Sequence, residues 1–185
     1  MTFQIKIIAC LGAVALLNSV TVEAQEAGAG VTVPPPPPPP DPCTDEAYRA
    51  MDFWIGEWEV HTPDGTQAGT NSIQPINGGC AILERYSVGG DLYGQSYSFY
   101  DPVRETWTQL WLSPGVIIRM EGPITEEGVL TLHGTLTTTT QSEPQAFVGR
   151  WTNQEDGTVL QEFWSQNPES EEWTNGFTGI YSRTD

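Results

Sequence analysis

Short runs rich in β-branched and aromatic residues follow one another from Phe53 to the C-terminus, and turn residues separate them. Runs of this length and composition, bounded by Gly, Pro, Asn and Asp, predict β-strands. Ten strands are expected, at Phe53–His61, Thr66–Ile76, Cys80–Val88, Tyr93–Tyr100, Thr106–Leu112, Val116–Gly122, Val129–Leu136, Ala146–Asn153, Thr158–Gln166 and Trp173–Arg183. Before them, Thr44 or Asp45 could cap a short helix that runs to about Asp52.

The connections between these runs are short, for example Pro63-Asp64-Gly65 and Asn77-Gly78-Gly79. Short turns join antiparallel neighbours, because a parallel return needs a crossover of a dozen or more residues. An open sheet of hairpin-linked strands would leave two long edges unpaired, and closure into a barrel removes both. The pattern therefore predicts an all-β fold: an up-and-down antiparallel β-barrel of about ten strands with a short N-terminal helix.

Alternate residues of a barrel strand point inward, so parity identifies candidate lumen residues. Trp107, Gln109 and Trp111 share one face of the fifth predicted strand. If that face points inward, Gln109 must bond to another buried side chain or to a ligand, because an unpaired buried amide costs about 1 to 3 kcal/mol. Glu84 and Gln161 are further polar residues that alternate with large apolar ones.

Parity leaves the fourth strand undecided, since either Tyr97 and Phe99 or Ser96 and Ser98 could face the lumen. Aromatic walls with a few convergent polar groups are typical of a small-molecule site. The alternative is that the aromatic side chains fill the barrel and the polar groups bond to one another. The candidate ligand-binding residues are Glu84, Tyr97, Trp107, Gln109, Trp111 and Gln161.

Residues 1–24 have the pattern of a secretory signal peptide. Lys6 supplies the positive start, Ile7–Leu17 the apolar run, and Val22-Glu23-Ala24 the small-residue cleavage site. A membrane anchor is the rival interpretation, but a spanning helix needs about 20 apolar residues and Asn18 interrupts the run early. We therefore expect cleavage after Ala24, a periplasmic or secreted location and no membrane span.

Residues 25–42 are rich in Gly and Ala and then in Pro, with an unbroken run from Pro34 to Pro40. Such a run forms an extended polyproline II segment, which is expected to act as a spacer. Recognition by a polyproline-binding partner is the alternative. The remaining residues, 43–185, are enough for one barrel domain with a single core.

Export changes the interpretation of the cysteines. Cys10 would leave with the signal peptide, which leaves Cys43 and Cys80 as a pair. An oxidising compartment lets such a pair form a disulfide, and we predict one. The competing possibility is two free or metal-bound thiols, but neither a CxxC motif nor a nearby His gives the spacing of zinc ligands. No metal is expected.

The chain carries 7 Lys and Arg against 24 Asp and Glu, a formal net charge of -17. This balance argues against nucleic acid, whose phosphates need basic partners. Lys6 is the only lysine, so the mature chain could form neither a Schiff base nor a lysine anchor for pyridoxal phosphate. No ordered Asp/Asn ladder for calcium is present, and no cofactor is expected. Solubility is the expected role of the glutamates at solvent parity or in loops: Glu57, Glu59, Glu169, Glu171 and Glu172.

An ordered series of motifs runs through nearly all of the chain from Cys43 to Arg183. It comprises Phe53-Trp54-Ile55-Gly56-Glu57-Trp58, Gly79-Cys80, Tyr100-Asp101-Pro102, Trp107-x-Gln109-x-Trp111 and Phe177-x-Gly179-x-Tyr181-x-Arg183. The series resembles a family of exported bacterial lipocalin-like proteins of unknown function, which open with Asp-Phe-Trp-x-Gly-x-Trp after a cysteine. The resemblance implies a calycin-type β-barrel and no particular activity.

Gly56-x-Trp58 together with the late Arg183 also resembles the lipocalin arrangement, in which an arginine of the last strand lies across the tryptophan of the first. The resemblance implies a structural cation–π contact between Trp58 and Arg183. The ten-stranded haem-binding nitrobindins share the Gly-x-Trp opening but use a histidine near the C-terminus as haem ligand. The two histidines here, His61 and His133, do not lie in the last strands. The resemblance to nitrobindins therefore does not imply haem binding by this chain.

The expected function is that of an exported barrel that binds a small, largely apolar or aromatic molecule in its lumen. One alternative is an envelope protein-interaction module with an acidic surface. Another is an isomerase or cyclase that uses Glu84 as a proton carrier. Gly94-Gln95-Ser96-Tyr97-Ser98 departs from the Gly-x-Ser-x-Gly of hydrolases. We therefore expect a binding protein rather than an enzyme and assign no catalytic residue. The ligand and the oligomeric state are left open.

Overall fold

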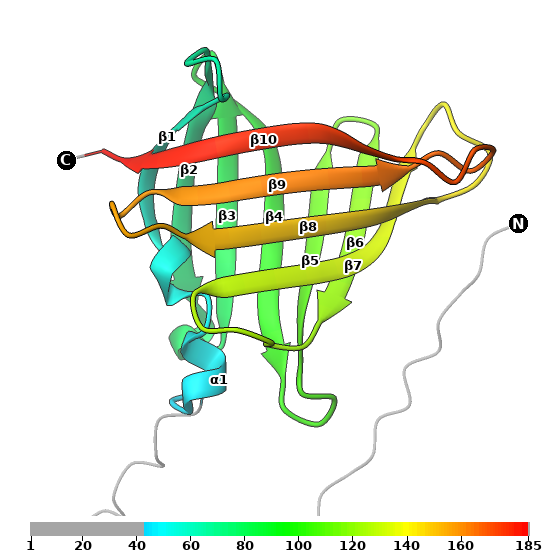
Figure 1. Cartoon of the computed structure of the whole chain (residues 1–185). Helices are drawn as coiled ribbons and strands as arrows, with labels where there is room; N and C mark the ends of the chain where they lie inside the picture. Colours follow the sequence, from blue (N-terminus) through cyan, green and yellow to red (C-terminus); the bar gives the residue numbers. More distant parts are fainter. Residues whose placement is uncertain (1–42, 185) are drawn as a thin grey trace, which may run out of the picture. The chain divides into compact units, whose positions relative to one another are not determined.

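The computed structural model describes residues 43–184 and shows a closed antiparallel barrel of ten strands. Each strand pairs with its neighbours in the chain, and β1 also pairs with β10, which closes the barrel (Figure 1). The all-β class and the barrel architecture are thereby confirmed. The strands are β1 Gly56–His61, β2 Gln67–Ile76, β3 Ala81–Val88, β4 Asp91–Asp101, β5 Thr106–Ser113, β6 Val116–Gly122, β7 Val129–Thr138, β8 Gln145–Asn153, β9 Val159–Gln166 and β10 Trp173–Arg183.

The strands are tilted relative to the barrel axis, so that the strands at the front of the molecule run at an angle to those at the back. In Figure 1, β8, β9 and β10 run across β3, β4 and β5, which lie behind them. Such tilt is required to close a sheet into a barrel. The inward residues of both layers meet in the space between them, where fifteen buried side chains form one apolar core.

A short helical segment covers one end of the barrel, and it differs in detail from the expectation. The helix α1 spans Glu46–Arg49 rather than reaching Asp52, and the side chain of the N-cap residue Asp45 makes no capping hydrogen bond. A 3-10 turn, η1, follows at Asp52–Trp54. The first strand therefore begins at Gly56 and not at Phe53, because the backbone before it turns back over the barrel end.

Large side chains from this segment fill the adjacent half of the lumen. Met51 and Trp54 are fully buried, and the Trp54 ring centre lies 5.6 Å from that of Trp151. The Trp58 indole donates a hydrogen bond of 2.9 Å to the carbonyl of Trp54. Burial of each such side chain contributes about 1.5 to 3 kcal/mol, so this end of the barrel is closed by a stable apolar plug.

Covalent and polar contacts hold the plug in place. Cys43 and Cys80 form a disulfide, as predicted, with their sulfurs 2.09 Å apart. It joins the start of the helical segment to η2, the 3-10 turn at Asn77–Gly79 between β2 and β3. The Trp107 indole donates a hydrogen bond of 3.0 Å to the carbonyl of Ala47 in α1. The helical segment is thus fixed to two sides of the barrel.

The opposite end has no such cover among the described residues, and its strand pairing is irregular. Three register shifts fall in this half, where β1, β3 and β9 end and β2, β4 and β10 begin. β-bulges are common at barrel rims, where they re-aim side chains. They lie between Val60 and His61, between Tyr86 and Ser87, and between Asn175 and Phe177. This end of the barrel holds the candidate site.

The predicted signal peptide, residues 1–24, and the predicted linker, residues 25–42, lie outside the described residues. Within residues 43–184, no helix combines the length and the apolar character needed to cross a membrane.

Candidate functional site

A cavity of about 540 Å³ occupies the lumen at the uncovered end of the barrel. Its walls are mainly aromatic and aliphatic, and a few polar groups lie among them. The lining residues are Ala68, Glu84, Tyr86, Val88, Tyr93, Trp111, Ser113, Val116, Ile118, Gln161, Phe163, Gly176, Phe177 and Tyr181. A concave apolar site of this size with a few polar groups matches the usual form of a small-molecule pocket.

Glu84 is the acidic residue of this cavity, and it is 3 % exposed. Strand β3 directs its side chain inward because Ile82 and Tyr86 share its parity. One carboxyl oxygen accepts a hydrogen bond of 2.7 Å from the Asn71 amide on β2. The other accepts one of 2.6 Å from the Ser96 hydroxyl on β4. Two neighbouring strands therefore fix the carboxyl in one orientation.

Burial raises the pKa of Glu84 from 4.5 to about 7. The two hydrogen bonds from Ser96 and Asn71 lower the pKa and so oppose this effect, but they do not cancel it. No Lys, Arg or His lines the cavity, and neither salt bridge found in residues 43–184 includes Glu84. The carboxyl therefore titrates near neutral pH without a cationic neighbour in the described chain.

A second pair of polar groups adjoins Glu84. The Tyr181 hydroxyl on β10 donates a hydrogen bond of 2.5 Å to the side-chain oxygen of Gln161 on β9. It also lies 3.4 Å from the Asn71 amide nitrogen, which can donate to it. Burial, and then the negative charge of Glu84, raise the pKa of Tyr181 well above its usual value. Tyr181 therefore stays neutral and links Gln161 to the carboxyl through Asn71.

Aromatic rings form much of the wall above these polar groups. The ring of Tyr86 lies edge-on to those of Trp111 and Tyr93, with centres 6.2 Å and 6.5 Å apart. On the other side, the rings of Phe163 and Phe177 are 5.8 Å apart. The Trp111 indole donates a hydrogen bond of 3.2 Å to the Ser113 hydroxyl, which orients this wall residue. The cavity is thus an aromatic pocket with one carboxyl near its floor.

The structure brings three of the predicted ligand-binding residues together and separates the others. Glu84, Trp111 and Gln161 line the cavity. Trp107 and Gln109 share the inward face of β5 with Trp111 but lie nearer the plugged end, both 1 % exposed. The Gln109 amide donates a hydrogen bond of 2.9 Å to the Ser98 hydroxyl. It is therefore paired with another buried side chain and does not face the cavity.

The prediction that Tyr97 is a ligand-binding residue of the lumen is wrong, because Tyr97 lies on the outside of the barrel. Its side chain is 47 % exposed, whereas Ser96 and Ser98 are completely buried. The reason is found on the adjacent strand, where Ser96 pairs with Trp111 and Ser98 with Gln109. Small residues on β4 leave room for these large side chains of β5. Tyr97 therefore does not line the lumen.

Two residues of the polar floor were missed in the sequence. Asn71 lies on β2 among polar residues, and only the register, in which Ile73 pairs with Glu84, places it beside the carboxyl. Tyr181 belongs to the Phe177-x-Gly179-x-Tyr181 motif, whose alternation could have indicated an inward row. The closure of β10 onto β1 was needed to bring that row next to β2.

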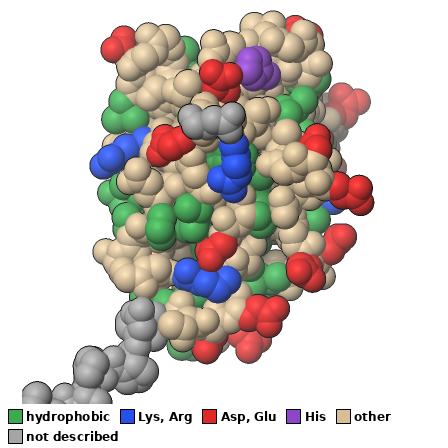
Figure 2. Space-filling model, turned by 90° about the vertical axis from the view of Figure 1, so that its left-hand side faces the viewer, with side chains coloured by type: hydrophobic (Ala, Val, Ile, Leu, Met, Phe, Trp, Pro, Cys, Tyr) green, Lys and Arg blue, Asp and Glu red, His purple; other side chains and the backbone are tan. Residues whose placement is uncertain are grey.

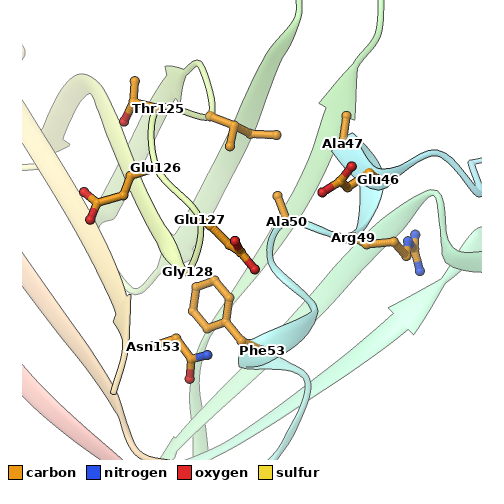
Figure 3. Close-up of a pocket in the computed structure, with 11 residues that line it drawn as sticks. Glu46, Ala47, Arg49, Ala50, Phe53, Thr125, Glu126, Glu127, Gly128 and Asn153 are labelled. Atoms are coloured by element: carbon orange, nitrogen blue, oxygen red, sulfur yellow. The ribbon is translucent and has the colours of Figure 1, made fainter. Parts of the chain in front are cut away.

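A larger groove of about 640 Å³ lies at the plugged end, between α1 and the loop before β7. Figure 3 shows Glu46 and Arg49 on one side of it and Glu126 and Glu127 on the other. These three glutamates are exposed to solvent. In the part of the chain that the structure describes, no three His, Cys, Asp or Glu residues are grouped closely enough to hold a metal ion. The groove therefore offers solvated charges but no enclosed site.

The outer surface carries the acidic excess of the chain in dispersed form. On the face shown in Figure 2, acidic side chains are scattered, and basic and hydrophobic ones lie between them. Glu57 and Glu59 on β1 are exposed, at solvent parity. Interspersed charges favour solubility and do not form one acidic docking patch on this face.

No protein-family model matches this chain, and a search of curated protein sequences finds no match either. The closed ten-stranded antiparallel barrel is consistent with a calycin-like fold. At its seam, the Arg183 guanidinium carbon lies 4.3 Å from the centre of the Trp58 ring.

Proposed function

We propose that this protein is an exported β-barrel that binds a small, largely apolar molecule at the uncovered end of its lumen. The observation that carries the proposal is the cavity of about 540 Å³, which has aromatic walls and a hydrogen-bonded carboxyl near its floor. A filled barrel would have no such space. Apolar walls would supply affinity through burial, and the few polar groups would orient the ligand.

Export is part of the proposal and is supported by two features. The Cys43–Cys80 disulfide fits an oxidising compartment. Residues 1–24 have the pattern of a signal peptide, so that residues 25–42 would become the N-terminal spacer of a mature chain whose domain is 43–185. N-terminal sequencing of the protein recovered from outside the cytoplasm should begin at Gln25. A mature chain that retains Met1 would contradict export with cleavage.

The ligand proposal is tested by tryptophan fluorescence and thermal shift against lipids, isoprenoids, tetrapyrroles and aromatic metabolites. Trp111 lines the cavity, so a bound molecule should change its emission. Trp111→Phe should remove most of this signal. Trp164→Phe is the matched control, because Trp164 alternates with the cavity residue Phe163 and faces away from the lumen. No change in emission or Tm with any class would contradict the proposal.

The lipocalin-like relationship is likewise proposed, on the strength of the ten-stranded barrel and the seam contact between Trp58 and Arg183. This relationship would account for the architecture and leaves the ligand open.

A second candidate function is favoured by one observation, the pKa of Glu84 near 7. A carboxyl that titrates near neutral pH is suited to carry a proton, as an isomerase or cyclase requires. Any ligand found in the screen can be incubated with the protein in D2O and examined by mass spectrometry. Deuterium incorporation or conversion to an isomer that Glu84→Gln abolishes would support this chemistry, and a wild-type protein that changes neither the mass nor the chromatographic retention of the ligand would exclude it.

A further inference from the structure

Glu84 is the one group in the cavity lining that can carry a charge near neutral pH. The other ionisable residues of the lining are tyrosines, and the pKa values of Tyr86 and Tyr181 are raised from an already high value. A buried charge is ordinarily paired with an opposite charge. Since the described chain provides no such partner here, the space beside the carboxyl is where one would be supplied.

The carboxyl of Glu84 brings free acceptor positions to the floor of the cavity. Each oxygen of Glu84 accepts one hydrogen bond, and a carboxylate oxygen can accept two. Asn71, which donates to one of these oxygens, lies behind the carboxyl and does not line the cavity. The oxygen of Gln161 is already used by Tyr181. A ligand group that donates several hydrogen bonds would therefore fit beside the carboxyl, while the Gln161 amide nitrogen brings N–H donors to the same lining.

The walls favour a positive charge for an independent reason. The faces of aromatic rings attract cations, and the effect is largest where water is excluded. Tyr86 and Trp111 form one side of the cavity, and Phe163 and Phe177 form the other. An aromatic enclosure with one carboxyl is an arrangement that stabilises an ammonium group and the apolar body attached to it.

We infer that the lumen binds an organic cation, an amine with an apolar body, whose ammonium group is held by Glu84. This inference rests on the proposed lumen-binding function and specifies its ligand class. The aromatic walls would enclose the apolar body, while the ammonium donates to the free acceptor positions of the carboxylate.

A pH dependence follows from the groups that face Glu84. These are Asn71 on β2, Ser96 on β4, Tyr181 on β10 and, along its own strand, Tyr86. None of them is a cation, so the bound ammonium would be the main group that favours the charged carboxylate. Because burial raises the pKa of Glu84 to about 7, the empty site is increasingly protonated at lower pH. Affinity for an amine should therefore fall roughly a hundredfold from pH 8 to pH 5.

The test uses three probes that share one apolar body and differ in charge: 4-phenylbutylamine, 4-phenylbutanol and 4-phenylbutyrate. Isothermal titration calorimetry at pH 8 with the mature protein should give an affinity for the amine at least tenfold above that for the alcohol, with the acid weakest. Glu84→Gln should remove the preference for the amine, so that the amine and the alcohol bind to the variant within about threefold of each other. Glu162→Gln is the control. Glu162 lies between the cavity residues Gln161 and Phe163 on β9 and therefore points to the outer face, so this substitution removes the same charge outside the lumen.

Equal or tighter binding of the alcohol or the acid by the wild-type protein would overturn this inference and leave the proposed function standing. Failure of all three to bind, when other apolar probes do bind, would also overturn it. An amine affinity that is independent of pH between 5 and 8 would do the same and needs no variant. If no probe of any class binds, the proposed function fails and the inference fails with it.

Discussion

The guanidinium carbon of Arg183 lies 4.3 Å from the centre of the Trp58 ring, and the two residues face each other in the pairing of β10 with β1. Arg183 also donates hydrogen bonds of 3.0 Å and 3.3 Å to the carbonyls of Ile55 and Phe53. One side chain thus joins the last strand, the first strand and the η1 turn. It closes the barrel seam at the plugged end, opposite the cavity.

Replacing Arg183 should therefore weaken the seam. Arg183→Met removes the cation–π contact and two hydrogen bonds, and we expect the free energy of unfolding to fall by about 1 to 2 kcal/mol. The loss is limited because the side chain is exposed and water can replace part of these contacts. Urea denaturation measures it. Arg119→Met removes the same charge from the exposed face of β6 and should change stability by less than about 0.5 kcal/mol. Equal effects of the two substitutions would contradict a seam role for Arg183.

Glu84 should make the folded protein less stable as pH rises towards neutral, which is the opposite of the usual effect of a carboxyl group. Its pKa is about 7 in the folded protein against 4.5 as the ordinary value, so between these pH values the folded state binds more protons than the unfolded state. The free energy of unfolding should therefore fall as pH rises through this window. The full cost above pH 7 is about 3 kcal/mol. Below pH 4.5 both states are protonated and the cost is absent.

Glu84→Gln removes this titration and keeps a similar shape. We expect the variant to be more stable than the wild type at pH 8, by up to about 3 kcal/mol, and nearly equal to it at pH 4.5. Denaturant melts at four pH values would show the difference. Glu162→Gln should follow the wild-type curve at every pH. A Glu84→Gln variant that is less stable than the wild type at pH 8 would show that the hydrogen bonds of the carboxylate outweigh its burial.

The disulfide should contribute strongly for a domain of this size. Cys43 and Cys80 are separated by 37 positions, and a closed loop of this length stabilises by roughly 3 to 4 kcal/mol in the chain-entropy model. Replacing both by serine should lower the free energy of unfolding by about this amount and leave the β-sheet circular dichroism unchanged. Reduction of the wild-type protein should reproduce the loss. Two reactive thiols in the denatured, unreduced protein would show that the bridge does not form.

The strands and their order were predictable from sequence because turn residues occur at each end of each run. For example, Gly89-Gly90 indicates a tight turn. In the structure this turn joins β3, which ends at Val88, to β4, which begins at Asp91. The depth of a residue along the barrel was not predictable. Parity placed Trp107 and Trp111 on one inward face, but which of them meets open space depends on where the Asp52–Trp54 turn folds back.

The inward face of β4 also required tertiary information. Ser96 and Ser98 alternate with Tyr97 and Phe99, and hydrophobicity alone favours the aromatic pair inside. Ser96 and Ser98 face inward because the opposed positions of β5 already carry Trp111 and Gln109. Side-chain volume across the strand pair decided the orientation, and the pairing register is what reveals it.

The same packing relation makes Gly94 a test of the cavity itself. A Cβ atom at Gly94 would overlap the six-membered ring of Trp111, which is held by its hydrogen bond to Ser113. Gly94→Ala should therefore push the indole into the lumen, shift its emission, and reduce the affinity of any lumen ligand at least tenfold, at a stability cost of about 1 to 3 kcal/mol. Gly176→Ala is the matched control, because Gly176 also lines the cavity but has nothing within 4 Å of the added carbon. If Gly94→Ala binds as tightly as Gly176→Ala, the ligand does not occupy the space beside Trp111.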